Sequence, residues 1–337
     1  MLQEDLDALV EQGAVAAVAQ VRDAEGVRAA AAGLVELGGE RAAEPAAWFR
    51  IGSVTKTYTA TALMQLVGDG AIALDDPVER WLPGLVRAGD RIVLRQLLDH
   101  TAGLHNYTSA WFGEGGLNVP LLLELGRTGP SAAEVLADAL AQPPNFEPGT
   151  SLAYDNTGYL LAAAVIEKAG GRPYEDHVTE RILRPLGLDH THVRWGSELP
   201  EPHTHGYLRL DDVPVDVSVY DRAAAGPAGG IAATANDVNR FFAGLLGGDL
   251  LAPAELAAMV EPTPWNEEGF RAGLGMIRTK LSNGVEVIGK DGNFLGYHCW
   301  SFHTLMADRQ LTLSVTSATD LPFSTAEVLA RFAYVFV

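Results

Sequence analysis

Patterns typical of β-strands lie at both ends of this chain, and their placement constrains the fold more than any other feature. Near the start, strand patterns over 15–22 and 27–33 flank a turn, which predicts a hairpin. Near the end, three further strand patterns occupy 285–288, 297–303 and 311–316. Segments from the two ends therefore predict one antiparallel sheet, with the rest of the chain inserted between them.

Helices and long loops fill the middle of the chain, where Pro-Gly and Pro-Pro pairs mark the turns. The predicted fold is α+β with two domains: an antiparallel sheet flanked by helices, and a mostly helical domain inserted in it. The sheet domain takes residues 1–60 and 266–337, and the insertion takes 61–265. From apolar spacing and caps, helices are expected at 2–10, 131–142, 158–170, 234–246 and 325–335.

Composition restricts the possible partners. The chain has 337 residues, enough to bury a substantial core, and a formal net charge of −19. Such an acidic protein is a poor partner for nucleic acids or anionic membranes, which bind basic surfaces. No stretch approaches the roughly 18 apolar residues of a transmembrane helix. The one cysteine, Cys299, excludes an internal disulfide, and its apolar strand context predicts a buried thiol.

The first residues, Met1 to Asp5, lack the basic and then apolar order of a signal peptide. We therefore expect a cytoplasmic protein if Met1 is the native start, and a secreted one if a leader has been removed.

Ser53 and Lys56 form a Ser-x-x-Lys motif directly after the strand-like stretch 48–51. At the start of a helix, residues three apart lie on one face. A serine hydroxyl needs a neighbouring base to act as a nucleophile, and a desolvated lysine, whose pKa is lowered, can be that base. Ser53 and Lys56 are therefore a candidate catalytic pair. The alternative is a helix cap followed by a solvated lysine.

Tyr154 and Asn156 form a second motif, just before the apolar helix expected at 158–170. A phenol beside a lysine ammonium can share its proton, so Tyr154 is a candidate for relaying protons between Ser53 and the leaving group. Asn156 can hydrogen-bond the lysine or a substrate amide. Taken alone, the motif also fits a loop tyrosine and a turn asparagine.

Lys290, Asp291 and Gly292 follow the strand pattern at 285–288 and are expected to line a cleft from an edge strand. Lys290 would orient the substrate, and Gly292 would let the substrate backbone approach closely. The backbone N–H of Asn293 is expected to pair with that of Ser53 as an oxyanion hole. The local alternative is a hairpin turn, which Asp-Gly commonly forms.

In this order and spacing, the motifs resemble those of the penicillin-recognising serine hydrolases, the family of penicillin-binding proteins and serine β-lactamases. The likeness covers nearly the whole chain. It is greatest to the class C β-lactamase-like branch and, within it, to streptomycete D-alanyl-D-alanine carboxypeptidases. The resemblance implies an active site at the seam between the two domains. The stretches that carry it are 51–56, 94–104, 147–149, 154–159, 228–231 and 234–237.

Two positions depart from the family pattern. The third motif usually has threonine in the middle, where this chain has Asp291, and a carboxylate there would repel a substrate carboxylate. The resemblance also implies an arginine that holds a terminal carboxylate at the position of Ile277, one residue before Arg278. Both changes disfavour a simple carboxypeptidase and efficient penicillin turnover. They favour a neutral or amine-bearing acyl donor.

Other chemistries have less support. The histidine pairs within 189–192 and 203–205 resemble metal ligands, but no cysteines or helical His pairs accompany them. Asp99 and His100 would suit a Ser-His-Asp triad, yet Lys56 already supplies a base, and the resemblance implies a structural turn there. The candidate nucleophile lacks the flanking glycines of an α/β-hydrolase. We expect no metal and no organic cofactor.

The sequence therefore predicts a serine hydrolase that acts through an acyl-enzyme on amide or ester bonds, resembling DD-carboxypeptidases, D-peptidases and esterases. Its partners would be a small-molecule or peptide acyl donor and, for transfer, an amine or alcohol acceptor. Two alternatives remain open: a cytoplasmic transacylase in a biosynthetic pathway, and a catalytically silent binding protein of the same fold.

Overall fold

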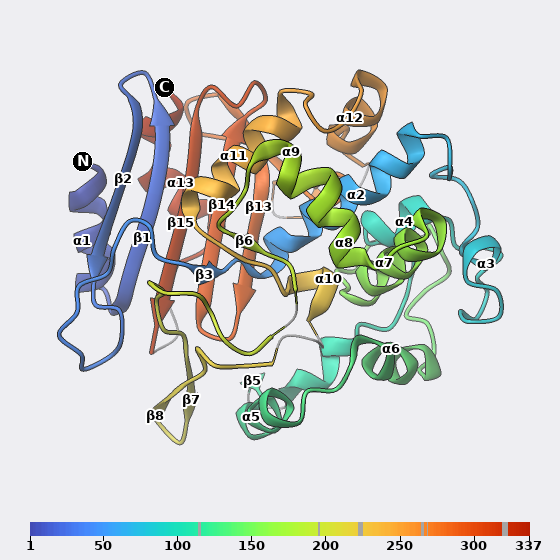
Figure 1. The fold of residues 1–337 in the computed structure, drawn as a ribbon, viewed down its shortest axis with the longest axis horizontal. Coiled ribbons are helices and arrows are strands. Elements are labelled where there is room, and N and C mark those ends of the chain that lie inside the picture. Colours follow the sequence, from blue (N-terminus) through green and yellow to red (C-terminus); the bar gives the residue numbers. More distant parts are fainter. Residues whose placement is uncertain (114–115, 195, 222–224, 264–265, 268, 319–322) are drawn as a thin grey trace.

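The computed structural model describes residues 1–113, 116–194, 196–221, 225–263, 266–267, 269–318 and 323–337. Among these residues the largest sheet has eight strands, each antiparallel to its neighbours, and the two chain termini lie beside it (Figure 1). In spatial order the strands are β10 (Asn266–Glu267), β11 (Phe270–Ala272), β12 (Ile277–Lys280), β13 (Glu286–Phe294), β14 (Tyr297–Thr304), β15 (Gln310–Ser317), β1 (Ala14–Asp23) and β2 (Gly26–Gly33).

Helices make up most of the rest of the described chain. They are α1 (Leu2–Glu11), α2 (Thr55–Gly68), α3 (Val78–Trp81), α4 (Leu94–Leu98), α5 (Val119–Thr128), α6 (Ala132–Ala141), α7 (Thr157–Gly170), α8 (Tyr174–Val178), α9 (Arg184–Leu186), α10 (Gly226–Gly229), α11 (Ala235–Leu246), α12 (Pro253–Val260) and α13 (Thr325–Arg331). Single turns are η1 (Gly52–Val54), η2 (Tyr107–Trp111), η3 (Thr179–Leu183) and η4 (Ala333–Phe336). None of the described helices is long and apolar enough to cross a bilayer.

Short strands tie the helical part together. β3 (Phe49–Arg50), β9 (Ala232–Ala233) and β6 (Thr191–His192) form one small sheet; β4 (Phe112–Gly113) pairs with β5 (Gly116–Leu117), and β7 (Tyr207–Leu210) pairs with β8 (Val213–Asp216). α2 is buried on every side because it packs against α7, α8, α10 and α12. The buried α2 thus provides a rigid support for the turn η1 that precedes it.

Both faces of the large sheet are covered. On one face, Leu311, Leu313 and Val315 of β15 join an apolar core with α1 and α13. On the other face α11 packs, and there the side chains of Gln310 and Thr312 donate hydrogen bonds to Asn239, 2.8 Å each. The alternating pattern of β15 therefore marks two buried faces, one apolar and one hydrogen-bonded.

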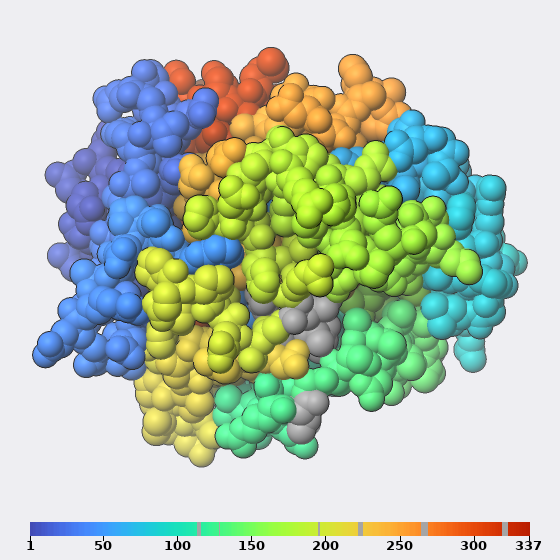
Figure 2. Space-filling model, in the orientation of Figure 1, coloured from blue at the N-terminus to red at the C-terminus, as the bar shows by residue number. Residues whose placement is uncertain are grey.

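The predicted fold class is confirmed, and the predicted helices and strands are present. In Figure 2 the first residues (blue) and the last residues (red) lie together at the left and top, and the cyan and green segments lie at the right, whereas the yellow segment around β7 and β8 lies below the first residues. The domain boundaries at residues 60 and 265 stay a prediction, and residue 265 itself lies outside the described residues. The last helix is shorter than predicted, because α13 ends at Arg331 and the separate turn η4 follows.

β13 corrects two predictions about the third motif. Residues 290–292 lie inside this strand, so the hairpin-turn alternative is wrong. The chain turns instead at Leu295 and Gly296, whose φ angles of 45° and 83° suit a tight turn between antiparallel strands. β13 is also not an edge strand, since it lies between β12 and β14. β12 pairs with it only as far as Gly289, which leaves one side of residues 290–292 open to the turn η1.

Candidate active site

Ser53 lies in η1, the turn between β3 and α2. Gly52 precedes it with a φ of 52°, a left-handed conformation that glycine adopts without strain. A Cβ atom on Gly52 would lie 2.7 Å from the backbone nitrogen of Asn293. The turn that presents Ser53 therefore packs against the backbone of β13 as closely as glycine allows.

Lys56 reaches Ser53 from the first turn of α2 and is completely buried. Its Nζ atom donates hydrogen bonds to Ser53 Oγ at 3.2 Å, to Asn156 Oδ1 at 2.6 Å and to the carbonyl oxygen of Ala228 at 2.8 Å. Burial lowers the pKa of Lys56, Tyr154 opposes this effect, and the Lys290 ammonium adds to it. Lys56 thus has both the position and the lowered pKa that a base for Ser53 needs.

Tyr154, in the loop before α7, donates its hydroxyl hydrogen to Ser53 Oγ at 2.7 Å. The Nζ atoms of Lys56 and Lys290 lie 4.9 and 5.5 Å from the centre of its ring. Partial desolvation of the phenol alone would raise the pKa of Tyr154, but these two ammonium groups and the hydrogen bonds with Lys56 and Ser53 lower it below its usual value. The residue is 41% exposed, so a substrate can reach the phenol.

Asn156 is held so that its oxygen faces the lysine. Its Nδ2 donates to Asn106 Oδ1 at 3.2 Å and to Thr108 Oγ1 at 3.1 Å, while its Oδ1 accepts from Lys56. Of the two roles predicted for Asn156, this geometry fits the orientation of the lysine. Sequence reasoning missed Asn106 and Thr108, because no local pattern marks residues whose partner lies far along the chain.

Lys290 and Asp291 form an ion pair, with 2.7 Å between Nζ and Oδ1. Asp291 Oδ2 also accepts a hydrogen bond from Thr325 Oγ1, 2.9 Å away at the start of α13. Burial alone would raise the pKa of Asp291, but Lys290 and Thr325 lower it. Burial would likewise lower the pKa of Lys290, but Asp291 and Tyr154 raise it. Both groups are therefore charged, and the carboxylate of Asp291 compensates the charge of Lys290. The role predicted for Asp291 beside the substrate stays a prediction.

Gly292 occupies a position where only glycine fits. A Cβ atom there would lie 2.1 Å from the carbonyl oxygen of Ile51 and 2.6 Å from the backbone nitrogen of Ser53. The same close approach brings the backbone of Asn293, whose side chain is exposed, beside that of Ser53. The backbones of Ser53 and Asn293 therefore meet here, and the role of their N–H groups as the two donors of an oxyanion hole stays a prediction.

The remaining candidates lie away from these contacts. Ile277 packs against the apolar core under α1 and α13, and Arg278 pairs with Glu286 at 2.5 Å, so neither is arranged to receive a substrate carboxylate. Cys299 is buried, which raises the pKa of its thiol. In the part of the chain that the structure describes, no three His, Cys, Asp or Glu side chains are placed to hold a metal ion.

A serine, a buried lysine and a tyrosine that meet at one hydroxyl, beside a backbone suited to bind an oxyanion, define a serine hydrolase of the acyl-enzyme type. A family model described as Beta-lactamase matches residues 2–334, and the chain therefore belongs to this family. Its named relatives support a serine amide or ester hydrolase.

Two solved structures resemble the chain along its whole length. A D-stereospecific amidohydrolase from Streptomyces sp. is 37% identical, with a TM-score of 0.88 and 98% of each chain covered. A D-amino acid amidase from Ochrobactrum anthropi SV3, solved with D-phenylalanine, is 25% identical, with a TM-score of 0.84 and 99% of this chain and 97% of that chain covered.

Curated relatives are longer proteins. Penicillin-binding protein 4* of Bacillus subtilis (strain 168) is 27% identical over 79% of this chain, and 60% of that protein is covered. A D-aminopeptidase of Cereibacter sphaeroides (strain KD131 / KCTC 12085) is 28% identical over 93% of this chain, and 59% of that protein is covered. The chain thus spans about three-fifths of the length of these relatives.

Proposed function

We propose that this serine hydrolase cleaves amides or esters of D-amino acids whose leaving group carries no carboxylate. Ser53 attacks the carbonyl carbon, while Lys56, with Tyr154, takes the Ser53 proton and returns one to the leaving amine or alcohol. The backbone N–H groups of Ser53 and Asn293 stabilise the oxyanion. Water then attacks the acyl-enzyme by the reverse route and restores Ser53.

The ion pair between Lys290 and Asp291 is the observation that supports a substrate without a carboxylate in its leaving group. A free cation beside the nucleophile would attract the terminal carboxylate of a peptide. Here the cation already has a partner at 2.7 Å, so a substrate carboxylate would have to compete with Asp291 for it. Two carboxylates that share one buried ammonium are costly, because burial strengthens their repulsion. A carboxamide or an ester avoids this repulsion.

The stereochemistry and the bond type rest on similarity. The solved structure that covers 98% of this chain at 37% identity is titled as a D-stereospecific amidohydrolase, and the curated relatives include a D-aminopeptidase and an esterase. These names support amides of D-amino acids as the first substrates to try, with esters as the second.

The test uses one peptide in two forms, D-alanyl-D-alanine with a free C-terminal carboxylate and with a C-terminal carboxamide, beside D- and L-phenylalanine amide. We expect turnover of D-phenylalanine amide over its L enantiomer, and of the carboxamide peptide over the carboxylate peptide. Ser53→Ala, with circular dichroism as a check of folding, should abolish turnover and the acyl adduct seen by intact mass.

Asp291→Thr and Asp291→Asn test the charge argument. Both variants free Lys290 from its counter-ion, so kcat/KM for the carboxylate peptide should rise about tenfold relative to the carboxamide, a change of about 1.4 kcal/mol. Equal gains in both variants would assign the effect to charge rather than to the threonine hydroxyl. Preference of the unmodified enzyme for the carboxylate peptide would contradict the proposal. Faster release of the acyl group by an added amine than by water would instead indicate a transacylase.

A further inference from the structure

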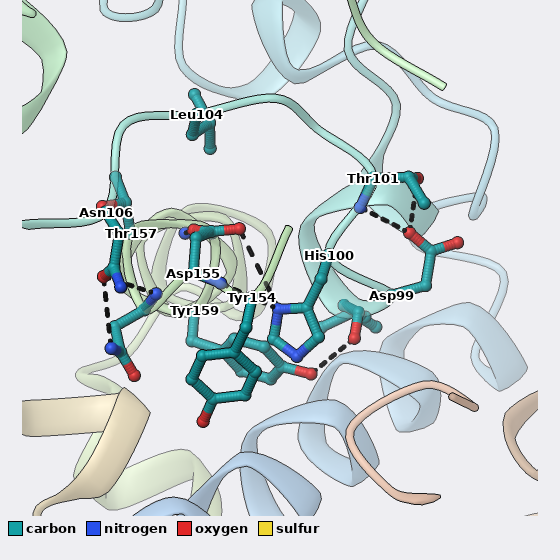
Figure 3. A network of polar contacts seen from close by, with 12 residues as sticks. Asp99, His100, Thr101, Leu104, Asn106, Tyr154, Asp155, Thr157 and Tyr159 are labelled. Atoms are coloured by element: carbon teal, nitrogen blue, oxygen red, sulfur yellow. Dashed lines mark hydrogen bonds and ion pairs between the residues drawn. The ribbon is translucent and has the colours of Figure 1, made fainter. Parts of the chain in front are cut away.

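His100 has a strained backbone in the turn that follows α4. Its φ is 64°, a left-handed conformation that is strained for a residue other than glycine. The neighbouring Asp99 stabilises this turn, because its Oδ1 accepts hydrogen bonds from Thr101 N at 3.1 Å and Thr101 Oγ1 at 2.6 Å. Such strain persists only where the surrounding structure imposes it, and Figure 3 shows what lies opposite: the side chain of His100 faces Tyr154.

His100 contacts the ring of Tyr154 and the two residues that flank Tyr154 in the chain, Ala153 and Asp155. The carbonyl oxygen of His100 accepts the N–H of Ala153 at 3.1 Å, and its Nδ1 accepts the N–H of Asp155 at 3.3 Å. The imidazole and phenol rings pack with 4.4 Å between their centres. His100 thus fixes Tyr154 at three points. Among the described contacts, His100 itself has no hydrogen bond to Ser53.

The support of His100 is itself fixed. Its ring lies 5.6 Å from that of Tyr159, whose hydroxyl donates to the carbonyl oxygen of Leu98 at 2.5 Å, at the end of α4. The carboxylate of Asp155 accepts the N–H of Gly158 at 2.6 Å, at the start of α7. α4 and α7 are therefore joined behind the imidazole, so a displacement of His100 would be passed on to Tyr154.

We propose that His100 is a positioning residue that acts through Tyr154, holding the phenol hydroxyl on Ser53 and the phenol ring beside Lys56 and Lys290. The inference rests on the roles proposed above for Ser53 and Tyr154. It does not depend on which amide or ester is the natural substrate.

This role requires a neutral imidazole, because Nδ1 accepts the N–H of Asp155 only when it carries no proton. Burial lowers the pKa of His100, the carboxylate of Asp155 opposes this, and the ammonium groups of Lys56 and Lys290 lower the pKa further. The other titratable groups that face it are Asp99, Tyr154 and Tyr159. Acidification that protonates His100 would therefore remove the hydrogen bond from the N–H of Asp155, and Nδ1 would instead face the carboxylate of Asp155, 3.9 Å away.

Two substitutions distinguish the effect of the aromatic ring of His100 from that of its hydrogen-bond acceptor. His100→Phe keeps a ring against Tyr154 and removes the acceptor, whereas His100→Asn keeps an acceptor and tolerates the left-handed backbone but removes the ring. His303→Asn is the matched control, because His303 is also a buried histidine stacked on an aromatic ring, that of Phe242 at 4.2 Å, but in the core of the sheet. The probes are hydrolysis of p-nitrophenyl acetate and the rate of labelling by a fluorophosphonate, each measured against pH, with thermal unfolding alongside.

We expect both His100 variants to lose roughly 30- to 100-fold in kcat with little change in KM, since a misplacement of about 1 Å costs on that order. The rising limb of the pH profile should move, because a displaced Tyr154 loses the lysines that lower its own pKa and no longer raises the pKa of Lys56. His303→Asn should lower the unfolding temperature without changing kcat or the rising limb of the pH profile. In a Tyr154→Phe background, a substitution of His100 should have little further effect on kcat. This double-mutant cycle needs only one His100 variant that folds.

Loss of stability without a change in kcat or in the rising limb would make His100 a purely structural residue and overturn the proposal. Full additivity of the His100 and Tyr154 substitutions would overturn it as well. Hydrolysis and labelling that survive in Ser53→Ala would instead overturn the proposed nucleophile, so the two failures are distinguishable.

Discussion

Substitution of Gly292 by alanine tests how far the site depends on close packing between β13 and the turn that carries Ser53. The added Cβ atom would lie 2.1 Å from the carbonyl oxygen of Ile51 and 2.6 Å from the backbone nitrogen of Ser53. Non-bonded atoms of this kind stay at least about 3 Å apart, since closer approach is strongly repulsive. The strand and the turn must therefore separate by about 1 Å.

The separation has a direct effect on the proposed oxyanion hole, because its two donors, the N–H groups of Ser53 and Asn293, lie on opposite sides of this contact. Loss of one such donor costs about 10²–10³ in kcat, or about 3–4 kcal/mol, and a misplacement of about 1 Å costs about 10². We therefore expect Gly292→Ala to lower kcat by about two to three orders of magnitude, with a small change in KM.

The assay is steady-state hydrolysis of p-nitrophenyl acetate, with the acyl-enzyme followed by intact mass. Gly229→Ala is the matched control: its Cβ atom would meet Gly52, in the turn that carries Ser53, at an ordinary 3.8 Å. This control should keep nearly full activity. If Gly292→Ala kept a kcat within a few-fold of the control, the strand and the turn would separate without loss of catalysis. That result would refute the assignment of the oxyanion hole.

Two further predictions concern protons. Tyr154→Phe should lower kcat by roughly 10²–10⁴, because the variant loses its proton relay. The rising limb of the pH-rate profile for the residual activity should lie at lower pH, because the variant lacks a group that raises the pKa of Lys56. A pH-rate profile checks both. Burial lowers the pKa of His303 to about 3, below the unfolded value of about 6.5, so the unfolded chain takes up more protons below that pH. The contribution of His303 is fully present above about pH 6.5 and should fall by about 2 kcal/mol at pH 5. Urea unfolding at both pH values should show this loss, and His303→Gln should reduce it.

Features with a local cause could be predicted from the sequence. Ser131 caps α6 and exchanges hydrogen bonds with Glu134, and Thr234 caps α11 by accepting the N–H of Asp237. Each cap depends on side chains three residues apart, which the sequence displays directly. Ser53 and Lys56 are predictable for the same reason, since one turn of helix brings them together.

Features with a distant cause could not be predicted. Asn106 orients Asn156, and His100 supports Tyr154, across about fifty residues of chain that no local pattern connects. Asp291 and Gly292 have the composition of a turn, yet pairing with β14 keeps them in a strand, and the turn falls at 295–296 instead. In both cases, tertiary contacts override or add to what the local sequence favours.

The two lysines of the site show how environment divides one chemistry into two roles. Lys56 and Lys290 are both buried, so desolvation favours the neutral amine in each. Only Lys290 has a carboxylate at hydrogen-bonding distance, and the pKa of Lys290 is raised while that of Lys56 is lowered. Titratable groups whose pKa values are pushed apart in this way serve as base and as fixed charge. Asp291 therefore keeps Lys290 charged beside Tyr154, which favours the phenolate. In the proposed function it would also withhold that charge from a substrate carboxylate.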